Sequence, residues 1–169
     1  MGGHTVKMDL LRQLFEKAGF SSVETFIASG NLTFVSKSTE AKVLENKIEK
    51  LLREALGYEA ATFIRTESEL AEISKYRPFS QAAMDKAAAL NVAFLKDPLD
   101  GQSKQKLMTL RTDIDDFHVH GREMYWSCQK HQSDSTFSNG LLEKTLGIQS
   151  TLRGINTIRK IAAKYPSKQ

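Results

Sequence analysis

The chain has 169 residues, of which 40% are hydrophobic and 26% are charged, with a formal net charge of +4 at pH 7. This mixture is that of an ordinary soluble globular protein, and it excludes the collagen-like, disulfide-scaffold and fully disordered classes. No apolar run approaches the ~18 residues that a membrane-spanning helix needs, and no charged-then-apolar signal segment opens the chain, so we expect no membrane partner.

The chain is predicted to open with a helix and a hairpin. Apolar residues at three- and four-residue spacings predict a helix that is capped by Thr5 and runs to about Ala18. The segments 23–29 and 32–36 have the composition of strands, and the two residues between them begin with Gly30, as a type II′ turn requires. Such a loop sets the register, so the residues that flank it are expected to face each other.

A second helix and a strand follow this hairpin. The helix is predicted to begin at Ser38 or Thr39 and to end at Gly57, with an apolar stripe facing the core, and the strand is predicted over 59–65. In a ferredoxin-like sheet, a strand ahead of the first helix would lie between 59–65 and the hairpin. We therefore expect that strand upstream of the given start, or another segment or chain in the gap, or direct pairing of the flanking strands. An open sheet edge recruits partners, which predicts a homo-oligomer.

The predicted organisation is a first subdomain over 1–76, a junction over 77–89 and a second subdomain over 90–169. Thr66 and Glu69 have the spacing of a capping box, which predicts a short helix at the end of the first subdomain. The junction contains an arginine–proline break and an alanine-rich stretch that suits either a loop or a short helix.

The second subdomain repeats the order of elements in the first and has a strand at its start. Its predicted elements are a strand over 90–95, a helix capped by Asp97 and running to about Leu110, hairpin strands over 116–120 and 123–127, a helix over 138–146, an extended segment over 149–153 and a last helix capped by Asn156. The sequence thus predicts an α+β protein of two ferredoxin-like (split β-α-β) subdomains. Each is expected to be an antiparallel-rich sheet with helices on one side, the first lacking its first strand, and a basic helix ends the chain.

The second hairpin is expected to have one apolar and one polar face, because its residues alternate across a two-residue Gly121-Arg122 turn. The side chains expected to be buried are Phe117, Val119, Met124 and Trp126. Those expected to be more exposed are His118, His120 and Glu123.

Two kinds of site could use this polar face. His118 and His120 could bind zinc together with Cys128, but the parity of Cys128 places it on the apolar face, so we expect no metal. With Tyr125, the histidines suggest a platform for stacking single-stranded bases, but Arg122 alone adds charge, which favours a plain solvent- or domain-facing surface. Neither a GxSxG nor an HExxH motif occurs, and we expect no cofactor.

Five short segments of the chain carry a resemblance to a known family. They are GGHTVKM at 2–8, FIASGNLTF at 26–34, NVAFL at 91–95, GREMY at 121–125 and RGINT at 153–157. These motifs resemble those of the bacterial domain-of-unknown-function family numbered 1697, over essentially the whole chain. The resemblance implies a two-subdomain α+β fold and no assigned activity. The chain departs from the family pattern at 132–140, where QSDSTFSNG replaces a GRSKL-like segment.

Positive charge is concentrated at the end of the chain. Residues 153–169 contain arginines and lysines but no acidic residue, which suits contact with phosphate groups or an acidic partner. A solvated helix face is the alternative interpretation.

Two helix starts could hold an anion. Gly3 precedes the first helix with Lys7 nearby, and glycines there can present backbone N–H groups. At the start of the last helix, cations oppose the macrodipole at a cost of ~0.3–1 kcal/mol that an anion would relieve, although ordinary capping by Asn156 is the alternative. The candidate anion- and ligand-binding residues are Gly3, Lys7, Arg153, Asn156, Arg159 and Lys160.

These features favour a non-enzymatic protein that binds an anionic partner, nucleic acid or a phosphorylated ligand, through its basic C-terminal segment. A small-substrate enzyme with a site between the subdomains, using His118, His120 or Glu123, is one alternative, and a protein-interaction module is another. The lone cysteine, Cys128, has no partner for an internal disulfide, which fits a cytoplasmic protein.

Overall fold

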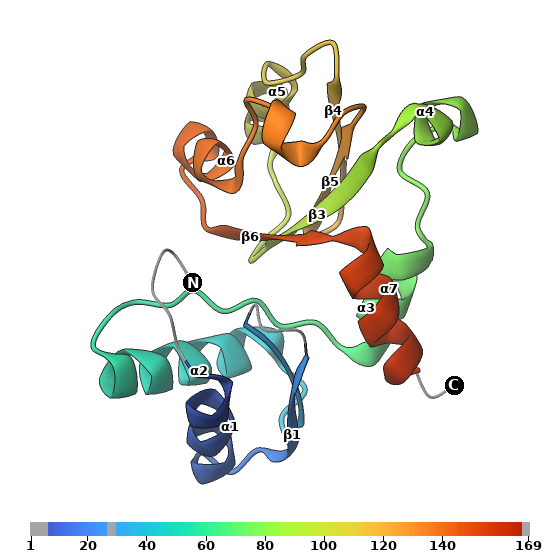
Figure 1. The fold of residues 1–169 in the computed structure, drawn as a ribbon. Helices are drawn as coiled ribbons and strands as arrows, with labels where there is room; N and C mark the ends of the chain where they lie inside the picture. The colour runs from blue at the N-terminus through green and yellow to red at the C-terminus, as the bar shows by residue number, and fades with distance from the viewer. Residues whose placement is uncertain (1–6, 27–29, 167–169) are drawn as a thin grey trace. The chain divides into compact units, whose positions relative to one another are not determined.

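The structure is a computed structural model and describes residues 7–26 and 30–166. The chain forms two compact units, Met1–Ile64 and Arg65–Gln169, which are described separately (Figure 1). This division falls before the expected end of the first subdomain at residue 76. The helix Glu67–Lys75, which follows the division, belongs to the second unit because this helix packs against the last helix of the chain. No helix in the described ranges is both long enough and apolar enough to cross a membrane.

The first unit contains two helices and a two-stranded antiparallel sheet (Figure 1). Its elements are α1 (Met8–Lys17), β1 (Ser21–Phe26), β2 (Asn31–Val35) and α2 (Ala41–Leu56). The amphipathic helices and one face of the hairpin bury a shared apolar cluster, as their sequence periodicity predicts. The buried members of this cluster are Leu11, Phe15, Phe20, Val23, Leu44, Ile48, Leu52 and Ala60.

The register of the first hairpin differs from the prediction. Phe26 lies opposite Asn31 and Thr25 opposite Leu32, so the connection is longer than the expected two residues. The ring of Phe34 packs at 5.5 Å from that of Phe15 and at 4.7 Å from that of Phe20, measured between centroids. Phe34 therefore packs into the aromatic cluster of the first unit.

The strand expected over 59–65 does not form. The backbone N–H of Ile64 donates instead to the Glu45 carboxylate of α2, at 3.0 Å, and Ala60 is buried in the core. This segment is therefore attached to a helix by side-chain contacts, without a neighbouring strand. Thr5, the expected cap of the first helix, lies outside the described residues, and Lys7 occupies the N-cap position of α1 without a side-chain hydrogen bond.

The second unit contains one four-stranded sheet, antiparallel throughout, in the order β4-β5-β3-β6. Its elements in chain order are α3 (Glu67–Lys75), α4 (Gln81–Lys86), β3 (Ala89–Leu95), α5 (Gly101–Met108), β4 (Asp115–His120), β5 (Glu123–Cys128), a 3-10 turn (Gln132–Asp134), α6 (Asn139–Leu146), β6 (Ser150–Gly154) and α7 (Ile155–Lys164). The chain is thus α+β, as predicted.

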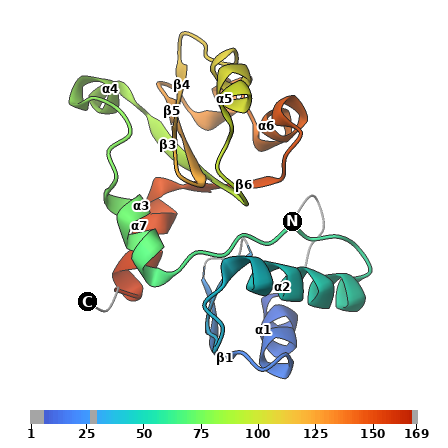
Figure 2. The ribbon, with the colours of Figure 1, turned by 180° about the vertical axis from the view of Figure 1, so that it is seen from behind.

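Helices cover both faces of this sheet, which corrects the expectation of helices on one side. One face packs on α5 and α6 through Trp126, Met124 and Phe117. The opposite face carries Val92 and Tyr125, and α3 and α7 lie side by side against it (Figure 2). The central strand β3 is buried almost without interruption, as a strand covered on both faces must be.

The second hairpin has the predicted register. His120 lies opposite Glu123 and His118 opposite Tyr125, and Gly121 has a φ of 60°, as the first position of a type II′ turn requires. The apolar face is buried as expected, except that Val119 is half-buried. A two-residue glycine-first turn flanked by alternating residues was therefore sufficient to predict this hairpin.

Two predicted helix caps are corrected, and one is confirmed. Asp100, not Asp97, caps α5, because its carboxylate accepts the Ser103 N–H at 2.7 Å. Gly154, not Asn156, is the N-cap of α7, because β6 continues directly into the helix. The capping box that begins α3 forms as predicted.

Candidate functional site

The residues proposed at the start of the chain cannot form a described site. Gly3 lies outside the described residues, and Lys7 is exposed in the first unit, at the N-cap of α1. The remaining candidates are in the second unit, where they divide between an exposed helix face and the sheet.

The helix α7 has a buried apolar stripe and an exposed basic stripe. Ile155 and Ile158 are buried, and the side chains at the next positions of that face are half-buried. The exposed positions follow i, i+3, i+4, i+7 and i+8 spacing, which places them on one face of the helix. We call these residues the basic face: Asn156, Arg159, Lys160, Ala163 and Lys164.

Two cations of the basic face have no side-chain partner among the described residues. The side chains of Arg159 and Lys160 form no hydrogen bond or ion pair with them, whereas the side chain of every other arginine in the described ranges does. The ammonium of Lys164 lies 5.5 Å from the centroid of the Tyr165 ring. Residues 153–169 contain no acidic residue, so no carboxylate of this segment itself compensates the charge of the face.

Arg153 is separated from the basic face by its position on the sheet. It lies opposite Val92 on β6, half-buried, and its guanidinium donates to Thr151 Oγ1 at 2.7 Å and to the Leu152 carbonyl at 2.9 Å. Burial lowers the pKa of this guanidinium. Sequence reasoning grouped Arg153 with Arg159, but the structure divides them between a half-buried strand and an exposed helix.

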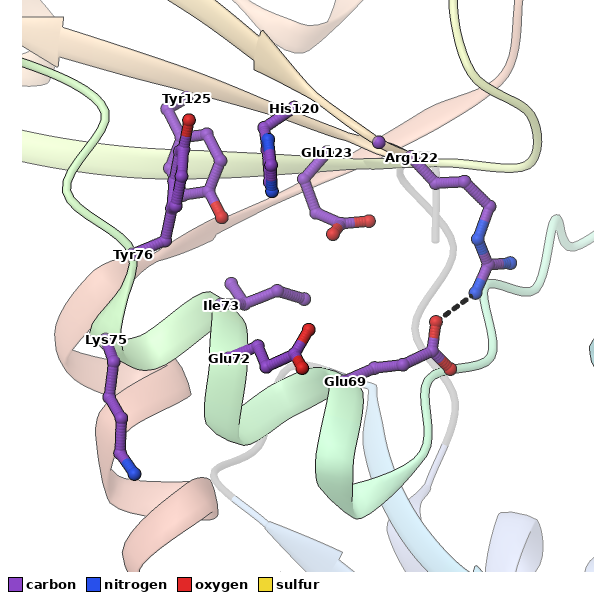
Figure 3. A pocket seen from close by; sticks show the side chains of 10 residues that line it. Glu69, Glu72, Ile73, Lys75, Tyr76, His120, Arg122, Glu123 and Tyr125 are labelled. Carbon is purple, nitrogen blue, oxygen red and sulfur yellow. Dashed lines mark hydrogen bonds and ion pairs between the residues drawn. The ribbon is translucent and has the colours of Figure 1, made fainter.

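A second feature, which the sequence did not predict, is a hollow of about 560 Å³ between α3 and the β4–β5 turn (Figure 3). We call it the α3 hollow. Its lining residues are Glu69, Glu72, Ile73, Lys75, Tyr76, His120, Gly121, Arg122, Glu123 and Tyr125.

A buried ion pair lies beside the α3 hollow. Arg65 Nε and Nη2 lie 3.1 and 3.0 Å from the same oxygen of Glu123. The side chain of Arg65 is 4% exposed and that of Glu123 is 13% exposed. The guanidinium also donates to the carbonyls of Leu95 and Arg122, both at 2.8 Å. Burial raises the pKa of Glu123, although the charge of Arg65 opposes this shift. Arg65 therefore joins the end of β3 to the β4–β5 turn.

A second ion pair connects the turn to α3. Arg122 Nη2 donates to Glu69 Oε2 at 2.6 Å, while Glu69 also completes the capping box with Thr66. Burial acts to raise the pKa of Glu69, but the Thr66 N–H and Arg122 outweigh it, and the pKa is lowered overall. The capping-box spacing predicted the local role of Glu69, but no local signal in the sequence indicated the contact with Arg122.

Tyr76 covers the polar face of the second hairpin. Its hydroxyl lies 2.8 Å from His118 Nε2, and its ring stacks on His120 at 4.1 Å between centroids and an interplanar angle of 13°. Tyr125, beneath it, is 1% exposed. The base-stacking platform, which the sequence did not favour, would need Tyr125 to be accessible, and this side chain is buried.

The chain matches a known protein family over most of its length. The model of the family described as "Protein of unknown function (DUF1697)" matches residues 1–125. The chain belongs to this family. The resemblance drawn from the sequence motifs is thereby confirmed, and every residue that lines the α3 hollow lies within the matched range, whereas the basic face lies beyond it.

A solved structure has the same fold. It is the conserved bacterial protein SP0830 from Streptococcus pneumoniae, with a TM-score of 0.73 and 22% sequence identity over 96% of this chain and 91% of that chain. No curated protein matches this chain.

No metal centre is found in the part of the chain that the structure describes, where no three histidine, cysteine or acidic side chains are grouped to hold an ion. Cys128 is buried on the apolar face, as its parity predicted, and burial raises the pKa of its thiol. Its position removes it from the polar face on which His118 lies.

Proposed function

We propose that this protein binds an anionic partner, a nucleic acid or a phosphorylated ligand, through the basic face of α7 and without catalysis. The observation that carries the proposal is the pair Arg159 and Lys160, which are exposed cations without a partner among the described residues. Elsewhere in the described chain, arginine side chains are held by carboxylates, carbonyls or amides, so Arg159 differs from the other described arginines in being free to contact a partner.

The geometry of α7 supports this function. One stripe of the helix packs against the sheet and α3, which fixes the orientation of the other stripe. Arg159, Lys160 and Lys164 then project from one rigid surface, where their charges add. Contact with phosphate groups would release counterions and would carry little sequence preference.

We infer a ferredoxin-like class for the second unit. The order β3-α5-β4-β5-α6-β6 and the sheet order β4-β5-β3-β6 are those of a split β-α-β fold, and they support the inference. In this unit α3 and α7 are additions that cover the second face of the sheet.

The test compares two variants with the same change in net charge. The first reverses the basic face (Arg159→Glu, Lys160→Glu, Lys164→Glu). The control reverses Lys104, Lys106 and Lys130, exposed lysines elsewhere in the second unit.

Binding of a fluorescein-labelled single-stranded oligonucleotide and of heparin is measured for both at ~50 mM salt. We expect the basic-face variant to lose affinity by more than tenfold relative to the control. Equal losses in the two variants, or no binding by the unaltered protein, would refute the proposal.

A further inference from the structure

The α3 hollow holds hydrogen-bonding groups that the protein does not use itself. We propose that it binds a small organic cation, an ammonium group attached to a flat or aliphatic body. This inference is independent of the basic face of α7, because it concerns another surface and a ligand of opposite charge.

The carboxylates of Glu72 and Glu123 supply hydrogen-bond acceptors to the hollow, and the charge of Glu72 gives it a preference for a cation. Glu72 is exposed, and its carboxylate forms no hydrogen bond or ion pair with any described residue. Glu123 projects from the facing wall and engages Arg65 through one oxygen, Oε2. Figure 3 shows both carboxylates pointing into the hollow, whereas Lys75 points away from it. An anion here would meet these acceptors, but an ammonium group would donate to them.

The positive side chains near the hollow do not cancel this charge. Arg122 is engaged with Glu69 at 2.6 Å, and Arg65 is engaged with Glu123 at 3.0 Å. Each arginine thus neutralises one carboxylate, and the charge of Glu72 remains for a ligand.

An unpartnered buried hydroxyl is the second, independent observation. Tyr125 is 1% exposed, and its hydroxyl has no hydrogen-bond partner among the described residues. Figure 3 shows this hydroxyl directed toward the hollow, on the side of Ile73. Buried polar groups are almost always hydrogen-bonded, and such an exception requires an explanation. A ligand that donates or accepts a hydrogen bond at this position would supply the missing partner.

The remaining wall fits the apolar part of such a ligand. Ile73 is buried at the base of the hollow, and the rings of Tyr76 and Tyr125 lie 5.1 Å apart between centroids. Aromatic faces attract organic cations through their quadrupole, and their surface also excludes water from a flat ligand body. The hollow therefore combines a carboxylate, an aromatic wall and an orphaned hydroxyl.

The experiment titrates the full chain with phenethylammonium, followed by amide chemical shifts. Two analogues of similar shape serve as probes of charge: neutral 2-phenylethanol and anionic 3-phenylpropionate. We expect shifts centred on Glu72, Tyr76 and Glu123, and at least tenfold weaker binding of both analogues. No shifts up to about 10 mM ligand, or equal affinity for the alcohol, would overturn the proposal.

Two variants test the groups that carry the inference. Glu72→Gln should weaken phenethylammonium binding about tenfold, whereas Glu67→Gln, on an exposed position of the same helix outside the hollow, should not. Tyr125→Phe should weaken binding and leave the melting temperature unchanged or higher, because it removes an unsatisfied hydroxyl. Unchanged affinity in Glu72→Gln and in Tyr125→Phe would contradict the assigned site.

Discussion

Arg65 and Glu123 form a buried ion pair at 3.0 Å, and through it the start of the second unit is fixed to the β4–β5 hairpin. Arg65 makes three further interactions. Its Nε donates to the same carboxylate oxygen, and its Nη2 donates to two backbone carbonyls, those of Leu95 and Arg122. The pair therefore acts as a junction between β3, the β4–β5 turn and the segment that leads into α3.

Replacing Glu123 with Gln should destabilise the protein although it preserves the shape of the side chain. The amide can accept one hydrogen bond from Arg65 but cannot balance its charge, which is buried. We expect a loss of about 3 kcal/mol in the free energy of unfolding, measured in urea. Glu59→Gln, which alters an exposed pair with Arg53, should change it by less than about 1 kcal/mol. Equal effects of the two substitutions would show that the buried pair is not a junction.

Tyr76→Phe should loosen the cover over the second hairpin. The substitution removes the hydrogen bond to His118 Nε2 and keeps the ring that stacks on His120. We expect a loss of about 1 kcal/mol in unfolding free energy, together with a changed ¹⁵N shift of the His118 ring. An unchanged His118 signal would mean that the two side chains do not interact in solution.

Acid stability should depend on Asp115, which is 2% exposed. Its carboxylate accepts hydrogen bonds from Trp126 Nε1, Ser135 Oγ and Thr112 Oγ1 at 2.7–2.8 Å. Burial alone would raise the pKa of Asp115, but these hydrogen bonds outweigh it and lower the pKa. The ionised form is thus stabilised by folding, so its contribution is present above the unfolded pKa of about 3.9 and is lost as the pH falls through the lower folded value.

Asp115→Asn removes this titration and provides the test. The variant should be less stable than the unaltered protein at pH 7, because the neutral amide is a weaker acceptor and places an N–H₂ group among donors. The difference between the two proteins should shrink as the pH falls from about 4 toward 2. Unfolding curves in urea at several pH values measure it, and a difference that is constant with pH would contradict the assigned role.

The sequence predicted the second hairpin well and the first poorly, for a physical reason. Between His120 and Glu123, the glycine-first turn and the alternating apolar residues require the same register. In the first hairpin, Leu32 lies opposite Thr25 and not opposite residue 29, a shift of four positions that leaves Phe34 on the same face in both registers. The apolar alternation therefore does not choose between these registers, and the glycine signal in the connection did not choose correctly.

The two candidate sites, the basic face and the α3 hollow, also differ in how far the sequence predicts them. The basic face could be predicted because Arg159 and Lys160 lie close together in an acid-free segment. The α3 hollow could not, since Glu69 and Arg122 are 53 positions apart and meet through the fold of the unit. The strand expected over 59–65 does not form for a related reason. The residues have strand propensity, but a strand also needs a neighbouring strand with which to pair, and local sequence does not show one.

The salt dependence of oligonucleotide binding tests the central claim most directly. If the basic face contacts phosphate groups, the logarithm of the association constant for a single strand should fall linearly with the logarithm of the salt concentration, by about 0.7 for each phosphate neutralised. The variant Arg159→Glu, Lys160→Glu, Lys164→Glu should show a slope smaller by about 2, while the control with Lys104, Lys106 and Lys130 reversed should keep the original slope. A slope near zero for the unaltered protein, or the same slope in all three proteins, would contradict the account.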